Sequence, residues 1–277
     1  MVLEQIVSTE FLERKRLFAL FLGFVYTLIA GVTSYIFFKD NISISMFFLI
    51  TLLLVPSLAN MIADQERKDS KEGIKHFIRN HKDVFEVYFF LSVGVVFGYG
   101  LVILILGLMN VDITLVLSEQ VKQFGSALTG DMINQFDVNK FGHFFGIFTS
   151  NLGVAIIFFI LSFFYGAGAI FLIVWNASVF STFLVISLQN IGRGVNHALG
   201  LIGTFAIYFF PEVAGFLLAG IAGGVISKAV IVEKWGSKNF QNVLRDASIL
   251  LLVSVLFLLI AGLLESYVAV GLIKALV

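Results

Sequence analysis

The sequence contains no cysteine, only two prolines and few charged residues. The absence of cysteine excludes disulfide bonds, thiolate metal sites, iron–sulfur clusters and a cysteine nucleophile. Charged residues make up 13% of the 277 residues and hydrophobic residues 59%, whereas a soluble globular domain carries about 25% charged residues. We therefore predict an all-α polytopic membrane protein, a transmembrane helical bundle with about six membrane segments.

Recognisable catalytic and cofactor motifs are also missing. There is no Walker loop, no His-Glu-x-x-His pattern and no Gly-x-Ser-x-Gly elbow, so we expect neither an enzyme nor a cofactor nor a metal site. The net charge is zero, which gives no reason to expect nucleic-acid binding. His76 and His81 are expected to be solvated, and His143 and His197, which border apolar segments, are expected to form interfacial hydrogen bonds.

The first half of the chain divides into alternating apolar and polar stretches. Residues 1–16 have the spacing of an amphipathic surface helix. Apolar runs then predict membrane spans at 17–38, 42–63 and 84–109. Between the second and third runs, residues 64–83 carry six basic side chains; we interpret them as a solvated cytoplasmic linker.

The later half contains two overlong apolar stretches, each with a polar interruption. Phe141 to Leu188 is interrupted at Asn176, and Asn196 to Val232 is interrupted by Pro211 and Glu212. Paired interrupted segments are typical of transporter binding sites. We therefore predict a broken or re-entrant helical hairpin around Pro211 and Glu212.

Two interpretations of Glu212 stay open. In the first, the segment is a helix kinked at Pro211, in which Glu212 caps the helical part after the proline and glycines such as Gly220 and Gly224 pack against another helix. In the second, Glu212 belongs to a binding or translocation site. Glycine faces of this kind suit packing within one subunit or within a homo-oligomer.

The distribution of basic residues predicts the topology. Thirteen of the 18 basic residues lie in 1–16, 64–83 and 228–245, so these segments are expected in the cytoplasm together with the N-terminus. If Arg193 is also cytoplasmic, residues 198–232 must enter and leave on the same side. The alternative places Arg193 outside and lets this segment cross once.

We treat the chain as a single integral membrane domain (1–277) with three parts. These are an N-terminal three-span part (1–109), which contains the cytoplasmic loop 64–83, an outer amphipathic helix (110–140) and a C-terminal membrane part (141–277).

The C-terminal part resembles a known family. The residues that carry the resemblance are Asn151, Gly166, Gly168, Asn176, Glu212 followed by the stretch Ala219–Gly224, and Glu265. In this order they resemble the stage II sporulation protein M family of integral membrane proteins, over about residues 141–270. Tyr208 and Phe209 stand where sporulation members usually have His-Gly, and Ala177 stands where they often have glycine, so the resemblance is to the wider prokaryotic branch.

The resemblance implies a non-enzymatic membrane component, which in sporulation members recruits peptidoglycan-degrading partners. Our first hypothesis is therefore a scaffold that acts through membrane or envelope proteins and is surrounded by membrane lipids. The second is a transporter or channel for a small solute, ion or lipid. Its hypothetical polar cluster comprises Glu212, Asn151, Asn176 and Glu265, with helix packing at Gly166, Gly168, Gly220, Gly224 and Pro211.

Overall fold

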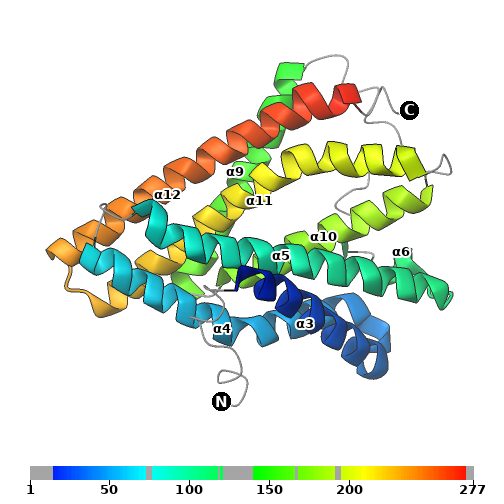
Figure 1. Ribbon diagram of the computed structural model, residues 1–277, viewed down its shortest axis with the longest axis horizontal. Helices are drawn as coiled ribbons and strands as arrows, with labels where there is room; N and C mark the ends of the chain where they lie inside the picture. The colour runs from blue at the N-terminus through cyan, green and yellow to red at the C-terminus, as the bar shows by residue number, and fades with distance from the viewer. Residues whose placement is uncertain are drawn as a thin grey trace.

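The computed structural model describes residues 15–72, 77–117, 119–120, 140–165, 168–190 and 195–272 (Figure 1). Over these residues the chain is helical and has no strand. The helices are α3 (Arg16–Phe37), the short η1 (Lys39–Asn41), α4 (Ile42–Glu72), α5 (Phe77–Leu108), α6 (Ile113–Val116), α9 (Lys140–Tyr165), α10 (Gly168–Asn190), α11 (Val195–Val232) and α12 (Lys238–Leu263), which continues as a π-helical turn, η3 (Leu264–Ala269).

Six of the described helices are long and apolar enough to cross a membrane, in α3, α4, α5, α9, α11 and α12. The shorter apolar stretch of α10 is Ile170–Val185, which is about 24 Å long at 1.5 Å per residue. The predicted all-α polytopic bundle with about six membrane segments is confirmed.

Helices α3 and α5 cross at unusually short range. A side chain at Gly23 would meet the carbonyl oxygen of Leu91, one at Gly94 would collide with the carbonyl oxygen of Leu20, and one at Gly31 would meet Val102. The residue numbers of the contacting pairs increase together along both helices, from Gly23 with Leu91 to Gly31 with Val102. Helices α3 and α5 are therefore parallel. Small residues let two backbones approach in this way, which replaces the hydrophobic drive that lipid cannot supply.

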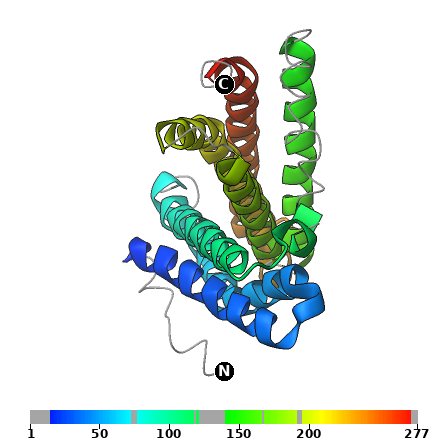
Figure 2. The same ribbon diagram turned by 90° about the vertical axis from the view of Figure 1, so that its right-hand side faces the viewer.

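Helix α11 forms the centre of the C-terminal part. In its span 67% of the residues are buried, against 11% in that of α9, and Figure 2 shows α9 at the edge of the bundle. Phe158 of α9 stacks on Phe216 of α11 at 5.3 Å, and the carbonyl of Phe159 lies against Gly223. Helices α9 and α11 therefore run parallel, so α10, which connects them, runs back between them.

Hydrogen bonds identify which helix ends lie together. Ser70, near the end of α4, donates to Glu233 at 2.5 Å, and Asn242 of α12 donates to the carbonyl of Ser70 at 3.4 Å. At the opposite end, His143 of α9 lies 3.1 Å from Ser266 of η3. The basic segments 64–83 and 228–245 thus meet at one end of the bundle.

The structure corrects the hairpin expected at Pro211 and Glu212. Helix α11 runs without interruption from Val195 to Val232, and its ribbon bends partway along (Figure 1). Proline removes one backbone hydrogen bond and kinks a helix, but neighbouring helices tolerate such a kink inside a membrane bundle. The alternative in which the segment crosses once is the one that agrees with the structure.

The interruption expected at Asn176 is also corrected. Asn176 lies inside α10, where its amide donates to the carbonyl of Leu172 at 2.8 Å. Because the side chain bonds to its own helix, the polar residue does not stop it. The break between α9 and α10 instead follows Tyr165 and precedes Gly168.

The described residues of the charged segment 64–83 are helical, where a solvated linker was expected. Helix α4 extends to Glu72 and α5 begins at Phe77, and His81, expected to be solvated, is buried. The expected surface helix at 1–16 and most of the outer helix at 110–140 lie outside the described residues, and so does His76.

Candidate functional site

Glu212 lies inside α11, directly after Pro211. The missing N–H of Pro211 leaves the carbonyl of Ile207 without its usual helical donor. Because α11 begins far earlier, at Val195, Glu212 is not close to a helix start. The interpretation of Glu212 as a helix cap is therefore wrong.

Glu265 occupies the second backbone irregularity of the C-terminal part. It belongs to the π-helical turn Leu264–Ala269, which continues α12 and packs against α9 and α11. Such turns are rare and occur frequently at functional sites. Both intramembrane glutamates thus lie where regular helical hydrogen bonding is disturbed.

Helix packing brings Glu212 and Glu265 together. Helices α11 and α12 are antiparallel, and Gly215 lies directly against Leu258. We count about two helical turns from this contact, back along α11 to Tyr208 and forward along α12 to Glu265. Tyr208 therefore lies opposite Glu265. Glu212 lies on α11 between Tyr208 and Gly215.

Neither carboxylate has a bonded partner within the described part of the chain, where no hydrogen bond or ion pair joins Glu212 or Glu265 to another group. Both side chains are partly buried. Two carboxylates placed together among apolar helices repel each other unless a proton or a cation lies with them. The pair is therefore chemically suited to exchange a proton or to hold a small cation.

Two further polar side chains flank this pair. His143 contacts Ser266 at 3.1 Å, which places its ring beside the turn that carries Glu265 and confirms the expected hydrogen bond. Asn151 is partly buried on the same helix, and the contacts of Phe158 with Phe216 and of Phe159 with Gly223 put it between the levels of Phe209 and Gly215. Asn151 therefore lies at about the level of Glu212.

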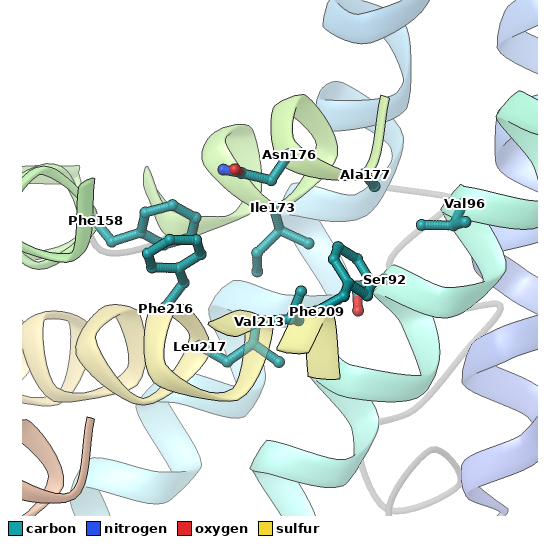
Figure 3. Close-up of a pocket in the computed structure, with 10 residues that line it drawn as sticks. All are labelled: Ser92, Val96, Phe158, Ile173, Asn176, Ala177, Phe209, Val213, Phe216 and Leu217. Carbon is teal, nitrogen blue, oxygen red and sulfur yellow. The ribbon is translucent and has the colours of Figure 1, made fainter. Parts of the chain in front are cut away.

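Asn176 belongs to a different place. It lines a cavity of about 20 Å³ between α5, α9, α10 and α11, together with Ser92, Phe209, Val213 and other residues (Figure 3). A space of this size holds about one water molecule. Glu212 is not among the residues that line this cavity, so the four members of the predicted polar cluster do not converge on it.

The predicted packing residues are distributed along the same helices. Gly220 and Gly224 are buried in α11, and the backbone of α9 approaches closest at their neighbour Gly223, where a side chain would collide with the carbonyl of Phe159. Gly168 begins α10, and Gly166 lies outside the described residues.

A family model for stage II sporulation protein M matches residues 87–270. The chain belongs to the stage II sporulation protein M family. No curated protein and no solved structure matches it. The match begins earlier than the resemblance at 141–270 and includes α5 from Val87 onward as well as α9 to η3.

The family region contains the whole polar site. Within the stage II sporulation protein M match, Glu212, Glu265 and Asn151 lie on three mutually packed helices. Across the described residues, no group of three or more histidine and acidic side chains is arranged to hold a metal ion.

Sequence reasoning missed a buried polar bridge at the other face of the bundle. Gln120 is 0% exposed; it accepts from Ser43 of α4 at 2.8 Å and donates to Ser178 of α10 at 3.3 Å. This side chain ties the segment after α6 to two membrane helices. A glutamine in a segment expected to lie as an amphipathic helix on the outer face gives no sequence signal of such burial.

Proposed function

We propose that the chain is a non-enzymatic scaffold of the cell membrane, with its N-terminus in the cytoplasm, that recruits other proteins. Family membership supports the membrane component, and the resemblance supports partner recruitment. The proposed orientation rests on the positive-inside rule. It is supported by the contact of Ser70 with Glu233, since this contact joins the two basic segments at one end.

The scaffold hypothesis rests on the hydrogen bonds that polar side chains form between helices in the interior of the bundle. Gln120 bridges Ser43 and Ser178, Ser181 of α10 donates to the carbonyl of Val96 on α5 at 2.9 Å, and Ser254 donates to that of Gly215 at 2.7 Å. These bonds link helix to helix instead of lining a route for a solute. Such a bundle is suited to hold a fixed shape that a partner can recognise.

The scaffold is tested by site-specific photocrosslinking in native membranes. A photoreactive residue at Lys122, in the stretch expected outside, should give discrete protein adducts, whereas one at Leu104, on the exposed face of α5, should react with lipid. Adducts that are equally diverse at both positions, or lipid adducts alone, contradict partner recruitment.

A transporter is the second candidate, and the Glu212–Glu265 pair is the observation that favours it. Intramembrane carboxylates without partners commonly mark ion or proton pathways. In proteoliposomes, this function requires a cation or proton flux that Glu212→Gln abolishes and that Asp40→Asn, at the exposed α3–α4 turn, leaves unchanged. Equal leakage with and without protein excludes it and favours the scaffold.

A further inference from the structure

The turn between α11 and α12 carries an unusual surface, which we call the turn patch. Its members are Lys228, Ile231, Val232, Lys234, Trp235 and Lys238. Trp235 is 75% exposed and Ile231 is 77% exposed, although both are large apolar side chains. We propose that the turn patch is a membrane anchor that binds the headgroups of anionic phospholipids in the adjoining leaflet.

The local backbone holds Trp235 in a defined position. Gly236 has a φ of 76°, which side-chain-bearing residues rarely adopt, and this reverses the chain directly after Trp235. Ser237 then caps α12 by accepting from the N–H of Phe240 at 3.2 Å. The ring of Trp235 stacks on that of Phe240 at 5.5 Å, so the exposed indole is supported from one side.

The charges around the turn favour an anionic ligand. Glu233 is occupied by its hydrogen bond from Ser70. Lys234 and Lys238 are exposed, and within the described residues no carboxylate pairs with them. The patch therefore presents lysines beside an indole and aliphatic side chains, the combination found where proteins meet lipid headgroups.

The depth of the turn patch follows from its neighbour α9. Phe158 of α9 stacks on Phe216 and Phe159 lies against Gly223, so in these parallel helices Tyr165 lies between the levels of Gly223 and Ala229. The sequence has no charged residue from 141 to 192, so the C-terminal end of α9 at this level belongs to the membrane or its interface. Trp235 lies about two helical turns further out, within reach of the headgroups.

The chemistry selects phospholipid over a soluble anion or a protein. A free phosphate would engage the lysines but leave Ile231, Val232 and Trp235 in water. An anionic phospholipid satisfies both halves of the patch, because its phosphate meets the lysines while its glycerol and upper acyl region meet the apolar side chains.

The two tryptophans of the chain make the depth measurable. Trp235 is the only tryptophan left in Trp175→Phe, which keeps an aromatic ring next to Phe47. In vesicles, bromine attached near the lipid headgroup should quench Trp235 fluorescence more strongly than bromine near the chain ends. If Trp175→Phe does not fold, the difference between wild type and Trp235→Phe provides the same signal.

Lipid selection is tested with brominated phosphatidylglycerol and brominated phosphatidylcholine at equal mole fraction. Brominated phosphatidylglycerol should quench the fluorescence of Trp235 at least about twofold more efficiently than brominated phosphatidylcholine, because the lysines attract the anionic headgroup. The triple change Lys228→Gln, Lys234→Gln and Lys238→Gln should remove this excess. Lys140→Gln, at the start of α9, is the matched control and should preserve it.

Three results overturn the proposal. Free access of iodide to Trp235 with no quenching by either lipid would place the turn in water, where a soluble partner is the better occupant. Equal quenching by both lipids would show that the turn patch does not prefer anionic phospholipid. An anionic excess that survives the triple change would show that these lysines do not cause it.

Discussion

Gly94 shows how a single residue decides a helix contact at the level of side chains. A Cβ at this position would collide with the carbonyl oxygen of Leu20 on α3. We expect Gly94→Ala to lower the free energy of unfolding by about 1–3 kcal/mol, because the backbones must separate. Gly100→Ala on the same helix is the control, since nothing lies within 4 Å of its added carbon. Thermal unfolding in detergent measures both, and equal effects would refute the close contact.

Ser254 provides a second test at the same scale. Its hydroxyl donates to the carbonyl of Gly215 across the α11–α12 contact. Ser254→Ala should cost about 0.6 kcal/mol, and at most about 1.7 kcal/mol, as for other hydrogen bonds between membrane helices. Ser248→Ala removes only a bond to the carbonyl of Leu244 in its own helix and should be close to neutral. A larger loss at Ser248 would contradict this comparison.

Residue identity predicted some functional candidates and not others. Glu212 and Glu265 could be selected from the sequence because carboxylates are rare in apolar segments. Gln120 and His81 could not, because burial of a polar side chain in a surface helix or a charged segment depends on tertiary contacts. The cap proposed for Glu212 failed because proline was taken as a helix start.

Among the helices, α11 decides how the carboxylates meet. Its register against α12 places Tyr208 opposite Glu265. The natural chain has no cysteine, so Tyr208→Cys combined with Glu265→Cys should crosslink with a short bismaleimide. Ile207→Cys with Glu265→Cys is the control and should crosslink far less, because Ile207 is exposed on another face. Equal yields in both pairs would disprove the register.

Hydropathy located the long helices but misjudged where they break. Apolar runs gave α3, α4 and α5 nearly in full, because length and composition suffice for isolated spans. The stop after Tyr165 was missed, since Gly166 to Gly168 is apolar, and a stop was placed at Asn176, whose amide bonds to its own helix. Whether a proline or asparagine interrupts a membrane helix depends on neighbours that satisfy the backbone.

In the whole molecule, the ends of the helices determine orientation and function. The end defined by Ser70, Glu233 and Asn242 carries most basic residues, and the opposite end carries His143 and Ser266. The sequence predicted that the basic segments share one side, because charge bias is readable without a fold. It left the single crossing of α11 as one of two alternatives, and the uninterrupted helix from Val195 to Val232 agrees with that one.

The central claim is that a closed membrane bundle, crossed once by α11, serves as a scaffold. The most direct test uses single cysteines and a membrane-impermeant thiol reagent applied to each side of sealed vesicles. We expect Lys39→Cys and Gln241→Cys to label from opposite sides, and Phe209→Cys, Val213→Cys and Asn176→Cys to label only after denaturation. Labelling of Val213→Cys in intact membranes, or labelling of both end positions from the same side, would contradict the account.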